Sequence, residues 1–179
     1  VFLHTLHTLR QYWPQSLITV HLPQEGPLLE RVEEFADEVI VGDLWVLRRA
    51  NLKLKNLPKL VPALKTLWAA YKRAQEYDVV YINTLMVLSY IFVGRFGKVP
   101  HILHVHEMAS GKKGMVLNLL ARLCGGRVIG NSNYTVNSLK WISQDRKVRI
   151  YNGVRDRGQQ TLAPSMAGAV HLLHVGRYN

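Results

Sequence analysis

The sequence predicts an α/β fold, a Rossmann-like parallel sheet with helices on both faces. Short segments rich in Val and Ile alternate with longer segments of helical periodicity, and the alternation repeats along the chain. Helical crossovers of this kind join strands that run parallel. The predicted strands are residues 17–22, 38–41, 78–83, 101–106, 127–131 and 147–151. The predicted helices are residues 2–12, 27–36, 62–76, 85–96, 115–124 and 135–142.

Local signals support these elements in order. Pro27 and Pro62 suit the first turns of helices 27–36 and 62–76, because proline presets a helical φ. The strands from residue 78 onward are short and apolar, as buried parallel strands are. Residues 111–114 have the wrong spacing for a phosphate-binding loop, and we expect them to form a mobile loop beside the active site.

Composition favours one globular domain. The chain has 179 residues, 48% of them hydrophobic, which is enough for one full core. Cys124 is its only cysteine, which agrees with a reducing compartment, and the cytosol is expected. Apolar stretches of about ten residues are too short to span a bilayer. The first residues lack the basic segment and cleavage site of a signal peptide.

The end of the chain predicts a domain boundary. Residues 1–155 read as one Rossmann-like domain, and residues 156–168 have the composition of a linker. Residues 169–179 begin with a predicted strand that has no partner nearby. A strand needs neighbours for its backbone groups, so we expect a second domain to begin here.

The net charge of +11 favours anionic partners. A basic amphipathic stretch stands out, with Leu and Trp interleaved among its cations: Arg48, Arg49, Lys53, Lys55, Lys59, Lys65, Lys72 and Arg73. It could lie on an anionic membrane, or its apolar side could face the core. Nucleic acid is not expected as a partner, because no stacking pattern, zinc-finger or ribonucleoprotein signature is present.

Polar residues follow several predicted strands, where ligands of open parallel sheets gather. Strand alternation puts His104 and His106 on one face, with Glu107 at the strand end. They could bind substrate, hold a metal ion as two histidines and a carboxylate, or be half-buried strand residues without a role. The remaining candidates are Asn83, Asn131, Ser132, Asn152 and Gly153. Helix capping or turn formation explains these about as well as substrate contact does.

Six segments, in order and spacing, resemble the retaining GT-B glycosyltransferases of family four. They are residues 22–28, 78–84, 98–107, 128–132, 148–154 and 172–177. The resemblance implies two Rossmann-like domains with the active site between them, and residues 1–155 as the N-terminal, acceptor-side domain. The family's first strand and glycine-rich loop are not matched, and the second domain's paired glutamates and lysine are not among these residues. The fragment alone is therefore expected to be inactive.

The resemblance also implies roles for individual residues. His106 matches the family histidine near the transferred sugar, with His104 as the second choice, and residues 152–154 match a loop beside the cleft. Arg177 matches the arginine that grips the donor diphosphate, a task suited to a forked cation. The implied reaction moves a sugar from a nucleoside-diphosphate sugar to an acceptor hydroxyl with retention, without an obligatory metal or other cofactor.

The implied setting is polysaccharide or lipopolysaccharide synthesis, with a saccharide or lipid-linked acceptor, at the inner face of the plasma membrane. Two rival functions stay open at this point. One is a GT-B-like sugar-nucleotide epimerase, which shares the fold but needs no separate acceptor. The other is a basic nucleic-acid-binding module, prompted by the charge alone.

Overall fold

The computed structural model describes residues 2–47, 60–107 and 111–153. The helices in this part of the chain are α1 (Phe2–Tyr12), α2 (Leu28–Glu33), α3 (Leu60–Ala74), α4 (Leu88–Phe96), α5 (Gly111–Leu123), α6 (Asn133–Ser138) and the short 3-10 helix η3 (Gln144–Arg146). The strands are β1 (Thr19–Leu22), β2 (Glu38–Val41), β3 (Val80–Ile82), β4 (His101–Val105), β5 (Arg127–Gly130) and β6 (Lys147–Arg149).

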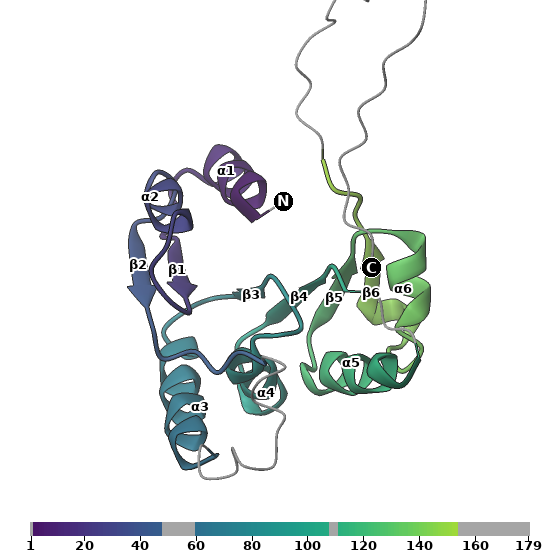
Figure 1. Ribbon diagram of the computed structural model, residues 1–179. Coiled ribbons are helices and arrows are strands. Elements are labelled where there is room, and N and C mark those ends of the chain that lie inside the picture. Colours follow the sequence, from purple (N-terminus) through teal and green to yellow (C-terminus); the bar gives the residue numbers. More distant parts are fainter. Residues whose placement is uncertain (1, 48–59, 108–110, 154–179) are drawn as a thin grey trace, which may run out of the picture.

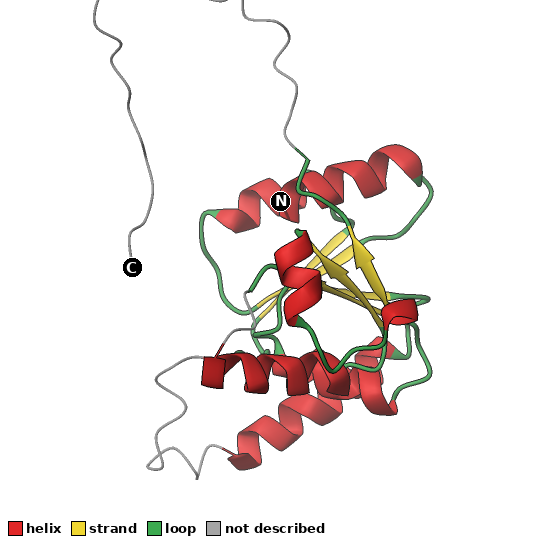
Figure 2. Cartoon of the chain, turned by 90° about the vertical axis from the view of Figure 1, so that its right-hand side faces the viewer, coloured by secondary structure: helices red, strands yellow, loops and turns green. Residues whose placement is uncertain are grey.

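All pairs of neighbouring strands among the described residues are parallel. β1 pairs with β2 in one sheet, and β3, β4, β5 and β6 pair in that order in a second sheet. Helices lie on both sides of the strands (Figures 1 and 2). The predicted fold class is therefore confirmed, although the described strands form two sheets and not one.

Each sheet has its own apolar core. The larger core is centred on β4 and includes the fully buried Leu85, Ile91, Leu103 and Val105. The smaller core joins α1 and α2 to the β1–β2 sheet through Leu6, Val20, Leu22 and Val32.

His21 of β1 connects the two parts of the molecule. Its Nε2 atom donates to the carbonyl oxygen of Gly42 at 2.5 Å, and its Nδ1 atom lies 3.0 Å from the Tyr90 hydroxyl on α4. The Gly42 carbonyl can only accept, so Nε2 carries a proton and Nδ1 accepts from Tyr90. Burial lowers the pKa of His21, which agrees with a neutral ring.

The helix predicted at 135–142 is shorter in the structure and ends at Ser138. Leu139 leaves the helical region and packs into the larger core. The buried Asn118 side chain replaces the missing helical bonds, because its amide donates to Ser138 O at 3.0 Å and its carbonyl accepts from Trp141 N at 3.2 Å. A tertiary contact thus ends this helix.

The prediction of a mobile loop at residues 111–114 is wrong. These residues form the first turn of α5, where Gly111 has a φ of +60°. Paired glycines are more typical of loops than of helices. A glycine in a helix costs about 1 kcal/mol relative to Ala. The burial of Leu120 and Ala121 on the apolar side of α5 outweighs that cost at Gly114.

Residues 154–179 lie outside the described residues. They include the predicted linker 156–168, the predicted strand 169–179 and Arg177. The domain boundary therefore stays a prediction. Much of the basic stretch, residues 48–59, also lies outside the described part, whereas its second half forms α3.

Gly126 lets β4 and β5 approach each other. A Cβ atom at this position would lie 1.9 Å from the backbone oxygen of His101, the first residue of β4. Atoms cannot come so close, so any side chain here would push the two strands apart.

We expect Gly126→Ala to lower the free energy of unfolding by about 2 kcal/mol or more, because the clash is with backbone and cannot be relieved by a rotamer change. Gly26→Ala is the matched control, since nothing lies within 4 Å of a Cβ there. Urea unfolding of both variants measures the difference. Equal stability of the two variants would contradict the close approach.

Candidate active site

Polar side chains from β3 and β4 meet where these two strands end. Asn83 and Thr84 directly follow β3, and His106 and Glu107 directly follow β4. The strands are paired in parallel with Ile82 opposite Leu103, so both chains leave the sheet at the same edge. The Nε2 atom of His106 lies 3.3 Å from Oδ1 of Asn83. The structure thus brings Asn83, His106 and Glu107 together, as parallel pairing requires.

Glu107 is held by contacts on both carboxylate oxygens. Thr84 donates its hydroxyl proton to Oε1, and the backbone N–H of His106 donates to Oε2 at 3.1 Å. The Thr84 hydroxyl in turn accepts from the Met86 backbone N–H at 3.1 Å. A chain of hydrogen bonds therefore fixes the carboxylate next to His106.

His104 and His106 lie on the same face, with ring centroids 4.1 Å apart. His104 is buried, and its Nδ1 atom contacts the Tyr81 hydroxyl at 2.5 Å. Its Nε2 atom has no hydrogen-bond partner among the described residues. Burial and the neighbouring His106 lower the pKa of His104 to about 4. His104 is therefore neutral at pH 7, and its ring packs against that of His106.

His106 is half-buried and closer to the open edge. Burial lowers its pKa below the ordinary value, and the Glu107 carboxylate opposes that shift. Because Asn83 Oδ1 can only accept, the hydrogen bond between them places a proton on Nε2 of His106. The neutral ring can donate one hydrogen bond and accept another, which suits the positioning of a hydroxyl group.

Asn131 and Ser132 follow β5, and Ser132 is the N-cap of α6. The Ser132 hydroxyl accepts from the Thr135 backbone N–H at 3.1 Å, and Asn131 Oδ1 accepts from the Thr135 hydroxyl at 2.8 Å. The predicted capping role is confirmed for Ser132. A substrate contact for either residue stays a prediction.

Asn152 and Gly153 follow β6 and are exposed. A Cβ atom at Gly153 would lie 3.0 Å from Nε2 of His4, so this loop passes close to α1. We call Asn83, His104, His106 and Glu107 the histidine cluster. Within the described part of the chain, no hydrogen bond joins Asn152 or Gly153 to it. Their contact with substrate stays a prediction, as does the contact of Arg177 with the donor diphosphate.

Sequence reasoning missed Tyr81. It precedes Asn83 by two positions, so strand alternation puts both on one face. Its ring packs edge-on against His104 with centroids 6.0 Å apart, and burial raises the pKa of its hydroxyl. Alternation was the available signal, but pairing Tyr81 with His104 also requires the register between β3 and β4.

No metal-holding group of three His, Cys, Asp or Glu side chains occurs within residues 2–47, 60–107 and 111–153. The two histidines and Glu107 therefore do not form the metal site that the sequence left open. Independence from an obligatory metal stays a prediction for the whole reaction.

The lowered pKa of His104 predicts a loss of stability in acid. The unfolded chain takes up a proton near pH 6.5, whereas the folded chain does so only near pH 4. The stabilisation is complete above pH 6.5 and falls as the pH drops from 6.5 to 4, by roughly 3 kcal/mol in all.

Urea unfolding of His104→Gln at pH 7 and pH 4.5 should show a smaller difference between the two pH values than the original chain shows. His4→Gln, at an exposed position of α1, is the matched control and should keep the full difference. An unchanged difference in His104→Gln would mean that other groups cause the acid sensitivity.

Comparisons with known proteins identify the family of this chain. Neither the curated proteins nor the solved structures contain a match to this chain. The family model described as Glycosyltransferase Family 4 matches residues 4–157, a span that includes every described strand and the whole histidine cluster. The chain therefore belongs to glycosyltransferase family 4.

Proposed function

We propose that this domain receives the acceptor of a retaining glycosyltransferase, in which a sugar moves from a nucleoside-diphosphate sugar to an acceptor hydroxyl. The family supports a transferase function in general. The observation that carries the finer proposal is the cluster of Asn83, His106 and Glu107 at the carboxyl edge of parallel strands. Ligands of open α/β sheets bind at this edge.

In the proposed reaction, His106 positions the transferred sugar or the reacting hydroxyl. Its neutral ring is oriented by Asn83, and Glu107 lies next to it with both oxygens already hydrogen-bonded. A group held in this way loses little conformational freedom when the substrate binds. Because Nε2 donates to Asn83, the Nδ1 atom would accept a hydrogen bond from a sugar hydroxyl, and the contribution of His106 is therefore orientation together with that bond.

The donor diphosphate is proposed to contact Arg177 and cations of a second domain. Negative charge develops on the diphosphate as the bond to the sugar breaks, and fixed positive charges stabilise it without reorganisation. In this proposal no metal ion is obligatory. The acceptor would be a saccharide or a lipid-linked oligosaccharide in cell-surface polysaccharide or lipopolysaccharide synthesis.

We expect His106→Ala in the intact enzyme to lower turnover by about 10²- to 10⁴-fold, because a positioned proton donor or acceptor contributes that much. Near-ultraviolet circular dichroism should stay unchanged. His7→Ala, at an exposed position of α1, is the control and should keep normal turnover. Product analysis with a labelled nucleotide sugar separates transfer from epimerisation. Normal turnover in His106→Ala would remove this residue from the site.

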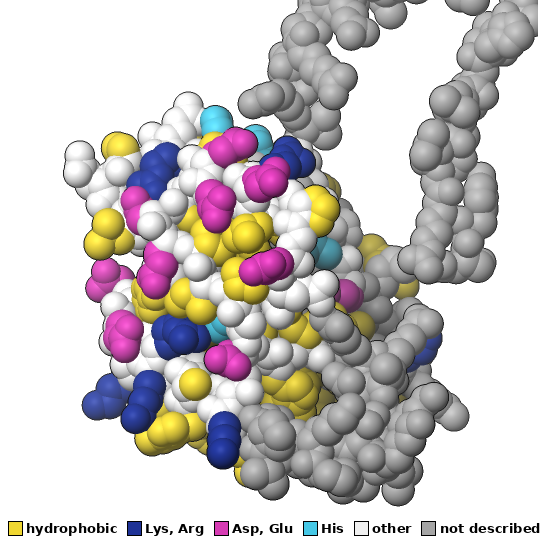
Figure 3. Space-filling model, turned by 60° about the vertical axis from the view of Figure 1, so that its left-hand side comes forward, with side chains coloured by type: hydrophobic (Ala, Val, Ile, Leu, Met, Phe, Trp, Pro, Cys, Tyr) yellow, Lys and Arg dark blue, Asp and Glu magenta, His cyan; other side chains and the backbone are white. Residues whose placement is uncertain are grey.

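We further propose that α3 and α4 rest on an anionic membrane surface. Between these helices lies an apolar groove of about 470 Å³, lined by Leu64, Leu67, Trp68, Tyr71, Phe92, Val93 and Phe96. Trp68 is 60% exposed and Phe96 is 74% exposed. Lys72 lies over the Trp68 ring at 5.5 Å, and Lys and Arg side chains are concentrated at this end of the molecule (Figure 3). Exposed aromatic rings beside cations are typical of interfacial helices.

Membrane contact by this groove would be peripheral. Within the described residues, none of the helices has the length and apolar character needed to cross a bilayer. A location at the inner face of the plasma membrane follows from the proposed acceptor and not from the groove itself.

Co-sedimentation with vesicles of phosphatidylglycerol and phosphatidylcholine tests this surface. We expect Trp68→Ser to weaken binding about tenfold, because the ring would no longer bury apolar area in the lipid. Trp13→Ser is the matched control, because Trp13 is 59% exposed and follows the end of α1, away from the α3–α4 groove. Binding that does not depend on anionic lipid, or that is equal in both variants, would contradict the proposal.

A further inference from the structure

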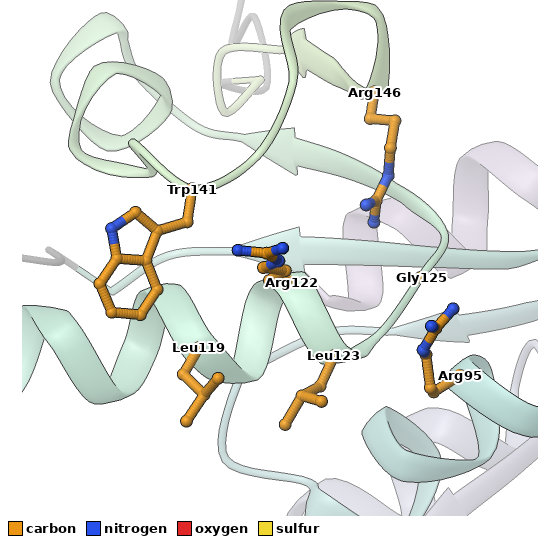
Figure 4. A pocket seen from close by; sticks show the side chains of 7 residues that line it. All are labelled: Arg95, Leu119, Arg122, Leu123, Gly125, Trp141 and Arg146. Carbon is orange, nitrogen blue, oxygen red and sulfur yellow. The ribbon is translucent and has the colours of Figure 1, made fainter.

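A second hollow lies at the opposite edge of the sheet from His106. Gly125 lies two residues before β5, Arg146 directly precedes β6, and Arg95 and Arg122 lie in the last turns of α4 and α5. With Leu119, Leu123 and Trp141, these residues line a hollow of about 400 Å³ (Figure 4). Because the strands are parallel, this is the edge at which strands begin. It is therefore separate from the candidate active site.

Three arginines and no carboxylate line this hollow. In the part of the chain that the structure describes, Arg10 and Asp37 form an ion pair, whereas Arg95, Arg122 and Arg146 form none. Arg95 and Arg122 are exposed. Three guanidinium groups around one space repel one another, and an anion bound between them would remove that repulsion.

Arg146 is held in place before any ligand arrives. Its Nε and Nη2 atoms both donate to the carbonyl oxygen of Gly126, at 3.0 and 2.7 Å. These two bonds fix the plane of the guanidinium group, and Figure 4 shows it directed toward Gly125 and the ends of the two helices. A fixed, forked cation loses little entropy when it binds a phosphate.

Helix-end electrostatics explain only part of this arrangement. A cation in the last turn of a helix is favourable, which accounts for Arg95 and Arg122 separately. It does not account for Arg146, which comes from a different segment and is anchored on Gly126. The convergence of all three on one hollow therefore points to a ligand.

The remaining walls are apolar and indicate what kind of anion fits. Leu119, Leu123 and Trp141 lie on the side away from Arg146, and Trp141 is 45% exposed. A bare ion would leave this apolar surface exposed to water, whereas the organic group of a larger phosphate ligand would cover it.

We propose that Arg95, Arg122 and Arg146 form an anion site that binds a terminal phosphate or diphosphate group of an organic ligand, apart from the candidate active site. The shared chemistry is a phosphomonoester or diphosphate, carried either by a lipid headgroup or by a soluble metabolite. The site does not depend on the proposed transferase reaction.

Titration of the chain with inorganic pyrophosphate tests the site, with the indole N–H resonance of Trp141 as the readout. We expect saturable binding that Arg122→Gln weakens by about tenfold or more, because a charge-assisted hydrogen bond is lost. Arg31→Gln is the matched control, since Arg31 is an exposed arginine in the last turn of α2. It should leave binding unchanged, and Arg95→Gln should repeat the effect of Arg122→Gln.

Vesicles of phosphatidylcholine with phosphatidic acid distinguish the two sources of phosphate. A lipid headgroup would be identified if pyrophosphate releases the chain from these vesicles and if Arg122→Gln binds the vesicles more weakly than Arg31→Gln does. Pyrophosphate binding without such release would identify a soluble ligand. No saturable change at Trp141, or equal effects of Arg122→Gln and Arg31→Gln, would overturn the proposal.

Discussion

The parallel pairing of β4 with β3 on one side and β5 on the other is the constraint on which the candidate site depends. It sets Ile82 opposite Leu103 and Val105 opposite Gly130, so the residues that follow each strand emerge at one edge. The contact between Asn83 and His106 exists only because of that register. The close approach at Gly126 belongs to the same constraint, since it lets the start of β5 lie directly against the backbone of β4.

The same strand direction gives the two edges of the sheet different chemistry. At the carboxyl edge, the Glu107 carboxylate lies beside two imidazoles whose pKa values are lowered, which suits hydroxyl-rich ligands. At the opposite edge, helix ends and strand starts bring permanent cations together, which suits phosphate. The two sites that we propose therefore use different side chains.

Much of this could be predicted from the sequence, and the rest could not for physical reasons. Alternation along β4 places His104 and His106 on one face, as the ring contact confirms. The pairing of Tyr81 with His104 and the gathering of three distant arginines depend on register and packing between segments far apart in the chain. Helix α6 ends early because a buried amide on α5 takes its hydrogen bonds, which no local pattern reveals.

The link through His21 has a mechanical consequence. The β1–β2 pair has its own ladder and its own apolar cluster, and an imidazole bridges from it to a helix of the larger sheet. Units that share side-chain contacts but no main-chain ladder open with different free energies. The lobe built from α1, α2 and these two strands can therefore open at a free energy of its own, different from that of the four-stranded sheet.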